Sequence, residues 1–251
     1  MRGTLYGVGT GPGDSELMTL KAVRIIKKCQ VIAIPVSDSR LSEPFLEEFK
    51  KRKQKGESRY YEYLKNCVAY QIALPNIPEM EQKDILYVPM PMMKEKEKLK
   101  QLHDLGAKRI EELLKNQKQV AFLTLGDPTV YSTYLYLHKR ILNQGLQAEI
   151  ISGVPSFCAS AARLNIGLVE NKQQLHVIPA SYGIEEAICL PGTKILMKAG
   201  KKMKEVKETV RKYHQEIEMV ENCGMEGERL YTSIDQVPEE SSYYSLIIIK
   251  D

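Results

Sequence analysis

The segment that most constrains the fold of this chain is an apolar run, Leu5–Val8, that leads into a loop of glycine and proline ending at Asp14. Glycine allows close approach of the backbone to a ligand, and proline stiffens the turn. Leu20, Val23 and Ile26 then recur on one face of a helix. A strand, a glycine-containing loop and a helix in this order are typical of open α/β sheets, which bind ligands at the carboxyl ends of their strands.

This first loop is neither of the two common nucleotide-binding motifs. The dinucleotide pattern G-x-G-x-x-G meets Pro12 when counted from Gly7 and Asp14 when counted from Gly9. The chain also has no G-x-x-x-x-G-K-[ST] phosphate loop. The loop therefore predicts a ligand other than NAD or ATP, and it argues against a nucleotide-dependent oxidoreductase.

Apolar runs and helical patterns alternate in the first part of the chain. This alternation predicts parallel strands and a doubly wound sheet covered by helices on both faces. The predicted strands are Leu5–Val8, Val31–Ile34, Val120–Thr124 and Ala148–Ile151, and the predicted helices include the stretches around Tyr60–Leu74 and Leu99–Leu114.

The pattern changes in the last third of the chain, where we predict a second α/β domain with a mixed sheet. One helix, Lys204–Tyr213, fits between strands there, and the stretch 227–244 resembles a hairpin with loops. The predicted domains are residues 1–168 and 169–251, with a linker at Asn165–Lys172, although the boundary could begin as early as about residue 140. The predicted strands are Leu175–Ile178, Lys194–Met197, Ile217–Val220 and Leu246–Ile249.

Composition excludes several classes of protein. The net charge of +4, from 36 basic and 32 acidic residues, is too small to indicate a nucleic-acid-binding surface. The five cysteines show no C-x-x-C spacing and the four histidines lie far apart, so we expect reduced thiols and no metal site in the protein. No apolar run is long enough to cross a bilayer, and no signal segment is evident, which predicts a cytoplasmic protein without membrane contact.

Two further segments repeat the order of strand, Gly/Pro turn and helix. The first is Leu123–Ser132, in which Gly126, Asp127 and Pro128 precede a predicted helix over Thr129–Arg140. The second is Ile151–Phe157. Because parallel strands end at one edge of a sheet, we expect the three turns to converge into one binding site. No nucleophile elbow or acid–base pair of carboxylates accompanies them, which suits a reaction whose substrates bring their own reactivity.

The three motifs Gly7–Asp14, Leu125–Pro128 and Ser152–Ser156, in this order and at these separations, resemble those of the tetrapyrrole methylases. These are S-adenosylmethionine-dependent enzymes of corrin and sirohaem biosynthesis, and the resemblance spans nearly the whole chain. Five further stretches are similar to the precorrin-2 C-20 methyltransferase branch of the family, including its cobalt-precorrin-2 counterpart. They are Asp14–Ile26, Ala69–Leu74, Leu196–Gly200, Glu221–Glu226 and Tyr244–Lys250.

The resemblance implies two α/β domains with a cleft between them, a homodimer, and S-adenosylmethionine as the methyl donor. It implies methylation of carbon 20 of precorrin-2 or cobalt-precorrin-2, a step of porphyrin and cobalamin biosynthesis. The third motif departs from the family, since Ser152 stands before Gly153 where most relatives carry proline. The residues that the resemblance places at the cofactor are Pro12, Leu125, Gly126, Asp127, Val130, Pro155, Ser156, Met197, Cys223 and Ser245.

The roles of proton acceptor and substrate contact are open at this point. Tyr131 and Glu226 are candidates for accepting the proton lost from carbon 20, as is water. Lys198 and Lys201 follow a predicted strand end, and they are candidates for binding the carboxylates of the tetrapyrrole. The alternatives are a methylase that acts at another ring position and a non-catalytic S-adenosylmethionine-binding module. The polar segment Ser37–Glu57 matches nothing in the family and is expected to be a mobile insertion.

Overall fold

Two β-sheets organise the chain, one in each of two units that comprise Met1–Val154 and Pro155–Asp251. The structure, a computed structural model, describes residues 2–55, 60–179 and 183–250. Each unit is described by itself below.

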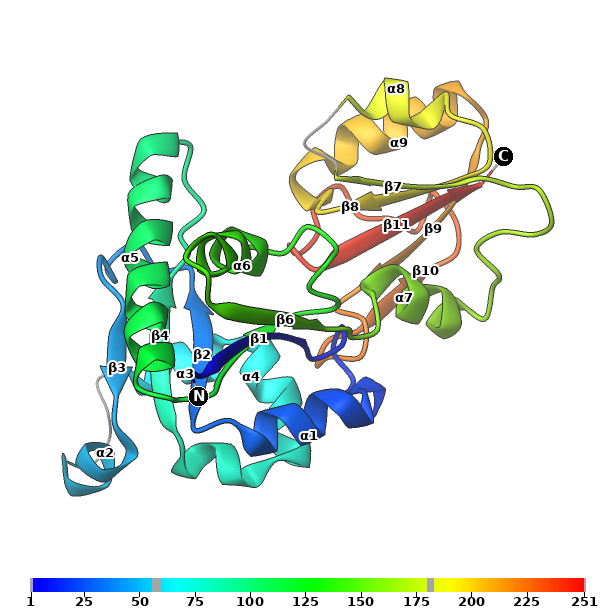
Figure 1. The fold of residues 1–251 in the computed structure, drawn as a ribbon. Coiled ribbons are helices and arrows are strands. Elements are labelled where there is room, and N and C mark those ends of the chain that lie inside the picture. The colour runs from blue at the N-terminus through cyan, green and yellow to red at the C-terminus, as the bar shows by residue number, and fades with distance from the viewer. Residues whose placement is uncertain (1, 56–59, 180–182, 251) are drawn as a thin grey trace. The chain divides into compact units, whose positions relative to one another are not determined.

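The first unit is built on a six-stranded sheet in the order β3-β4-β2-β5-β1-β6 (Figure 1). Five of its strands are parallel, whereas β3 is antiparallel to β4 at one edge. The five parallel strands therefore all end at one edge, which we call the loop edge of the first unit. The strands are β1 (Thr4–Gly9), β2 (Val31–Val36), β3 (Phe45–Glu47), β4 (Asp84–Pro89), β5 (Val120–Thr124) and β6 (Gln147–Ile151).

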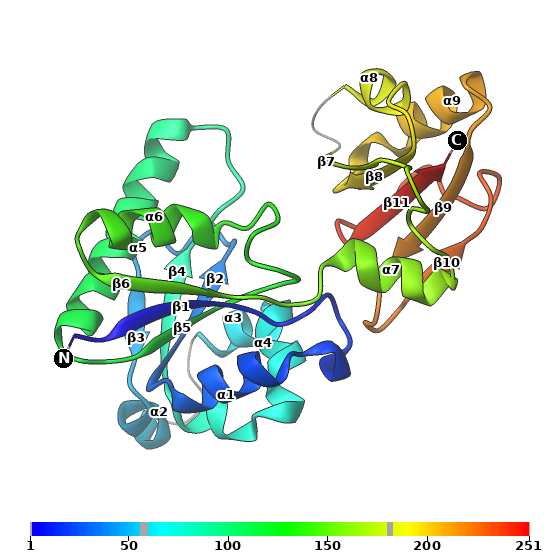
Figure 2. The ribbon, with the colours of Figure 1, turned by 45° about the vertical axis from the view of Figure 1, so that its right-hand side comes forward.

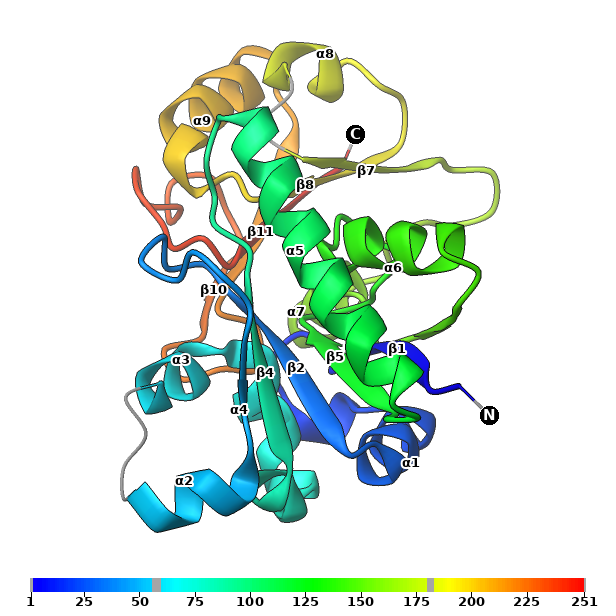
Figure 3. The same cartoon turned by 60° about the vertical axis from the view of Figure 1, so that its left-hand side comes forward.

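Helices cover both faces of this sheet, which confirms the predicted doubly wound arrangement (Figure 3). One face packs against α1 (Leu20–Lys28), α3 (Tyr61–Asn66) and α4 (Val68–Ala73). The other face packs against α5 (Lys96–Lys115) and α6 (Tyr134–Asn143). Three short 3-10 turns, η1 (Ser15–Leu17), η2 (Leu74–Asn76) and η3 (Pro78–Gln82), complete the connections.

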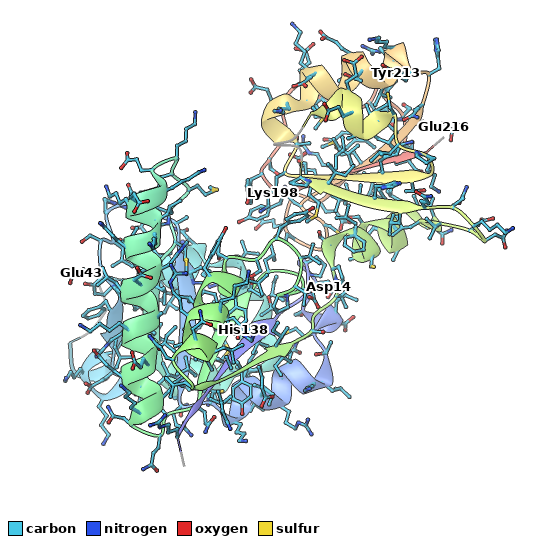
Figure 4. All side chains as sticks on the ribbon, turned by 45° about the horizontal axis from the view of Figure 1, so that its top comes forward. Asp14, Glu43, His138, Lys198, Tyr213 and Glu216 are labelled. Carbon is cyan, nitrogen blue, oxygen red and sulfur yellow. The ribbon has the colours of Figure 1, made fainter. Side chains whose placement is uncertain are left out.

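The side chain of Tyr134 explains one glycine of the first motif. Gly7 lies inside β1, and a Cβ atom there would stand 2.0 Å from the Tyr134 ring. The Tyr134 hydroxyl donates to the carbonyl oxygen of Glu149 at 3.1 Å, and it lies 2.9 Å from Nδ1 of His138 (Figure 4). Gly7 therefore makes room for a fully buried tyrosine that ties α6 to β6.

The segment expected to be a mobile insertion contains an edge strand and a helix. Residues 45–47 form β3 beside β4, and α2 (Phe49–Lys55) follows. The Phe45 ring stacks on Tyr60 with centroids 4.3 Å apart, and the buried Tyr87 hydroxyl donates to Glu47 at 2.9 Å. These contacts attach residues 45–47 to the sheet, so the interpretation as an irregular insertion was wrong for residues 45–55, whereas residues 37–44 contain no helix or strand.

The second unit has a five-stranded mixed sheet in the order β10-β9-β11-β8-β7. One face packs against α7 (Ser156–Leu164), and the other against α8 (Ile184–Ile188) and α9 (Met203–Lys212) (Figure 2). The strands are β7 (Leu175–Pro179), β8 (Thr193–Met197), β9 (Glu216–Glu221), β10 (Arg229–Tyr231) and β11 (Ser245–Lys250), and a 3-10 turn, η4 (Gly200–Lys202), precedes α9.

The predicted strands are confirmed, but several other elements differ from prediction. The helix predicted over Thr129–Arg140 begins only at Tyr134, and the helical stretch Tyr60–Leu74 is broken at Cys67. The two units divide at 154/155, which falls within the range given above for the boundary. Helix α7 belongs to the second unit, where Ala161 packs against Ile195 and Ile248 of the second sheet. No helix in the described part of the chain is long and apolar enough to cross a bilayer.

Candidate functional site

Three main-chain bends meet at the loop edge of the first unit. Gly11 and Gly126 form an isolated bridge, in which the Gly126 N–H donates to the Gly11 carbonyl oxygen at 2.8 Å. Gly153 lies against the same bridge, because a Cβ atom on it would stand 2.3 Å from the Gly126 oxygen and 2.9 Å from the Gly9 Cα atom. The expected convergence of the three turns is therefore confirmed within this unit.

The carboxylate of Asp127 holds this junction together. It is buried, and its Oδ2 atom accepts from the Gly153 N–H at 3.0 Å. Its Oδ1 atom accepts from the backbone N–H of Thr129 at 2.7 Å and from the Thr129 hydroxyl. A buried charge must be hydrogen-bonded, and here all three donors belong to the loops themselves. Asp127 thus joins the second turn to the third by hydrogen bonds. The sequence analysis did not identify Thr129 as its partner.

Buried hydroxyl groups fix the start of the loop that follows β5. The backbone N–H and the hydroxyl of Thr10 both donate to the Thr124 carbonyl oxygen, at 3.0 and 3.2 Å. The Thr124 hydroxyl in turn lies 2.9 Å from that of Ser132. The loop 125–133 is therefore held at both ends, and within it Thr129, Tyr131 and Thr133 are exposed.

Tyr131 stands in that loop in an unusual backbone conformation. Its φ is +47°, in the left-handed region that bulky side chains seldom adopt, and its side chain is exposed. Such strain persists only where the surroundings enforce it, and it is concentrated at functional sites. Leu125 and Val130 lie half-buried in the same loop, whereas Pro12 is buried in the first bend. The structure thus brings these four predicted residues, together with Gly126 and Asp127, to one junction.

The second unit gathers its predicted residues at one edge of its own sheet. β8 and β9 end where β11 begins, because Leu246 pairs with Met197 and Ser245 pairs with Glu221. We call this the loop edge of the second unit. Met197 is half-buried there, and Cys223 and Ser245 are buried. The Ser245 hydroxyl donates to the Ser242 carbonyl oxygen at 2.7 Å, so this side chain also supports the local backbone.

Strained residues mark this second edge as well. Lys198 directly after β8 has a φ of +63°, and Asn222 directly after β9 has a φ of +53°. The Lys198 ammonium lies 5.8 Å from the centre of the Tyr243 ring, within the range of a cation–π contact (Figure 4). The backbone N–H of Ser242 donates to Glu221 at 2.7 Å, and the Asn222 N–H donates to the Tyr244 carbonyl oxygen at 3.1 Å. These bonds join the three chain segments of the edge.

The remaining predicted residues are less well defined by contacts. Pro155 is the N-cap of α7 and Ser156 is its first residue, both half-buried. Glu226 is exposed in the loop after β9. The side chain of Lys201 lies outside the described part of the structure, although its backbone is part of η4.

Among the described residues, neither a metal cluster nor the cavity of the second unit competes with these edges. The described residues contain no group of three His, Cys, Asp or Glu side chains placed to hold a metal ion. A cavity of about 400 Å³ lies in the second unit beside Glu216, Ile217 and Glu218. Lys198 and Glu216 lie at opposite ends of the sheet, so this cavity is remote from the loop edge of its unit (Figure 4).

Comparison with known proteins identifies the family. The model of the Tetrapyrrole (Corrin/Porphyrin) Methylases matches residues 4–238. This chain is a member of the tetrapyrrole methylases. The methylase is 33% identical over 98% of its length to a probable cobalt-precorrin-2 C(20)-methyltransferase of Methanocaldococcus jannaschii, covering 95% of that protein. It is also 24% identical to a precorrin-2 C(20)-methyltransferase of Sinorhizobium sp, over 98% of this chain and 95% of that protein.

A solved structure shares the fold of this methylase. The uroporphyrin-III C-methyl transferase of Thermus thermophilus, in complex with S-adenosyl homocysteine, superposes with a TM-score of 0.65. The match covers 99% of the methylase and 98% of the other chain at 20% sequence identity. The resemblance inferred from the three motifs, and the two α/β domains it implied, are thereby confirmed.

The junction of the three bends generates a prediction about Gly153. Replacing Gly153 by alanine would force a Cβ atom against the backbone of Gly126 and Gly9, which has little freedom to retreat. We expect a loss of stability of about 1–3 kcal/mol or more, which lowers the thermal unfolding midpoint by about 2–4 °C per kcal/mol in a chain of this size.

Gly167→Ala is the matched control, because nothing lies within 4 Å of its added Cβ atom. Circular dichroism or scanning fluorimetry of both variants checks the prediction. Equal unfolding midpoints for Gly153→Ala and Gly167→Ala would contradict the crowded junction.

Proposed function

We propose that this tetrapyrrole methylase transfers a methyl group from S-adenosylmethionine to carbon 20 of precorrin-2 or cobalt-precorrin-2. The product is precorrin-3 or its cobalt form, and the step belongs to cobalamin biosynthesis. The observation that carries the proposal is the similarity over 98% of the chain to a relative that bears the name of this activity. The five stretches that resemble the same branch of the family agree with it; they are Asp14–Ile26, Ala69–Leu74, Leu196–Gly200, Glu221–Glu226 and Tyr244–Lys250.

The residues at the two loop edges fit the proposed cofactor. A ligand at the first edge meets main chain, because glycine occupies the bends at Gly11, Gly126 and Gly153. The half-buried side chains of Leu125 and Val130 offer apolar contact for a nucleoside. Pro12, Gly126 and Asp127 complete the proposed contacts of this edge. From the second unit and its loop edge we propose Pro155, Ser156, Met197, Cys223 and Ser245.

The chemistry requires little of the protein beyond placement. When bound, S-adenosylmethionine supplies a methyl group on a sulfonium, which is electrophilic without further activation. The chain has to align that methyl group with carbon 20, exclude water and remove one proton. The absence of a nucleophile motif from the sequence is consistent with this division of work. The exposed carboxylate of Glu226 and the hydroxyl of Tyr131 are the proposed routes for the proton.

The deciding experiment supplies the full chain with methyl-labelled S-adenosylmethionine and precorrin-2, with and without cobalt. We expect the tetrapyrrole to gain one labelled methyl group, which magnetic resonance locates at carbon 20. Label at another carbon would instead indicate a methylase with a different ring specificity. Cofactor binding without transfer to either substrate would indicate a non-catalytic module. The two arms of the assay also decide whether the acceptor carries cobalt.

The proposal includes two further expectations from the sequence, namely that the protein is a homodimer and that it is located in the cytoplasm. Light scattering of the purified chain at working concentration measures its oligomeric state, and a mass corresponding to one chain would exclude the homodimer.

The hydrogen bonds of Asp127 generate a prediction about cofactor affinity. Asp127→Ala removes the acceptor of the Gly153 N–H and of Thr129, so the second and third turns are no longer joined by this side chain. We expect the free energy of S-adenosylmethionine binding to weaken by about 1.5–3 kcal/mol, because the loops proposed to contact the cofactor lose internal hydrogen bonds to a charged group. Calorimetric titration measures the change. Thr129→Val, which removes only the hydroxyl contact, is the milder companion. An unchanged affinity in Asp127→Ala would remove Asp127 from the site.

The position of Lys198 generates a prediction about the tetrapyrrole. Precorrin-2 carries several carboxylates, and Lys198 is an exposed cation at the second loop edge. Lys198→Ala should raise the KM for the tetrapyrrole about twofold to fivefold, as for one exposed ion pair. The KM for S-adenosylmethionine should change little. Lys172→Ala, also exposed in the second unit, is the control, and equal KM values in the two variants would count against Lys198. Lys201→Ala, measured against the same Lys172→Ala control, tests the proposed contact by Lys201.

A further inference from the structure

The loop that follows β9 has a tightly determined backbone. Asn222, Gly224 and Gly227 all adopt positive φ, at +53°, +70° and +76°. The Asn222 side-chain amide donates to the Gly227 carbonyl oxygen at 3.3 Å, and the Met225 N–H donates to the Asn222 carbonyl oxygen at 2.9 Å. This loop carries Cys223, one of the proposed cofactor contacts.

The carboxylate of Glu228 accepts a hydrogen bond from the backbone of this loop. Its Oε2 atom accepts from the Gly224 N–H at 2.6 Å. Its Oε1 atom accepts from Nε of Arg163 at 2.8 Å and also from Nη2 of that side chain. Arg163 belongs to the last turn of α7, in the same unit. Its guanidinium, first, and then the Gly224 N–H hold the pKa of Glu228 below its usual range, so the carboxylate is ionised at neutral pH.

Planarity of the peptide bond gives this contact a directional consequence. The N–H of Gly224 and the C=O of Cys223 belong to one trans peptide and point in opposite directions. When Glu228 captures the N–H, it also determines the direction in which the Cys223 carbonyl oxygen faces. A loop with glycine at its centre would otherwise rotate this peptide at little cost.

We propose that Glu228, oriented by Arg163, is a positioning residue that sets the Cys223–Gly224 peptide for contact with S-adenosylmethionine. The inference rests on the proposed function, because it requires Cys223 to meet the cofactor. It adds an acidic residue and a basic partner that lie outside the motifs on which the cofactor contacts were proposed. The effect on the cofactor passes through the main chain and not through a side-chain contact with it.

A purely stabilising ion pair is the competing explanation. The Arg163 side chain is 57% exposed, and exposed ion pairs contribute only about 0–1 kcal/mol. The distinctive element is the short bond from the Gly224 N–H, which a simple ion pair does not require. The two explanations therefore differ in whether cofactor affinity changes more than overall stability.

The experiment measures calorimetric binding of S-adenosyl homocysteine to the full chain and the steady-state constants for both substrates. Glu228→Gln removes the charge and one acceptor. We expect it to weaken binding by about tenfold, as for loss of a hydrogen bond to a charged group. It should raise the KM for S-adenosylmethionine more than it lowers kcat, with the KM for the tetrapyrrole nearly unchanged.

Arg163→Gln leaves the acceptor in place but releases its orientation, so a smaller loss is expected, and Arg163→Lys should recover part of it. Asp235→Asn is the matched control, because it breaks the exposed Arg211–Asp235 pair of the same unit, 3.0 Å long. If Glu228→Gln does not fold, weaker binding in Arg163→Gln at an unchanged unfolding midpoint supports the proposal, and unchanged binding overturns it.

Two results would overturn the inference while leaving the proposed function intact. One is wild-type affinity in Glu228→Gln, and the other is an equal loss in Glu228→Gln and Asp235→Asn. Failure of the unmodified chain to bind S-adenosyl homocysteine would instead overturn the proposed function, and this inference with it.

Discussion

The contact on which the first unit depends is the meeting of Gly11, Gly126 and Gly153, braced by the carboxylate of Asp127. Each glycine lies two residues beyond the end of a different parallel strand, so the junction requires that β1, β5 and β6 are in register. No side chain larger than hydrogen fits at Gly153, and the buried carboxylate needs donors from both flanking loops. The geometry of the proposed cofactor site therefore depends on the strand register of the sheet.

The second unit also gathers its proposed cofactor contacts at one edge of a sheet, although its strands are not all parallel. Its sheet is mixed, so the loop edge joins the ends of β8 and β9 to the beginning of β11. Carboxylates again organise the backbone, with Glu221 accepting from Ser242 and Glu228 accepting from Gly224. At each loop edge, therefore, a buried or half-buried carboxylate accepts from main-chain N–H groups. A site assembled in this way suits a reaction in which placement does most of the catalytic work.

Much of this arrangement was predictable from the sequence, and the failures have physical causes. Apolar runs located most of the main strands because continuous burial leaves a strong signal. The edge strand β3 was missed because it has only three residues and none of them is buried, whereas β4 was overlooked although Ile85–Val88 form such a buried run. The turn at Asp127 predicted a helix start at Thr129. The Asp127 carboxylate instead accepts from Thr129 and Gly153, and α6 begins only at Tyr134. The sequence placed Gly7 in the first strand, but it gave no sign that this glycine accommodates the ring of Tyr134, which lies far along the chain. The partnership of Arg163 with Glu228 spans 65 residues and leaves no local pattern.

The use of main chain at the junction of the three bends has an evolutionary consequence. Amide and carbonyl groups are common to every amino acid, so a seat made from them tolerates exchange of most neighbouring side chains. Only the positions that enforce the bends, such as Gly153 and Asp127, are restricted by steric fit or by an internal partner. If the proposed donor site lies at this junction, divergent relatives can alter the residues that meet the acceptor while keeping the main-chain bends, so that one scaffold serves different tetrapyrrole acceptors.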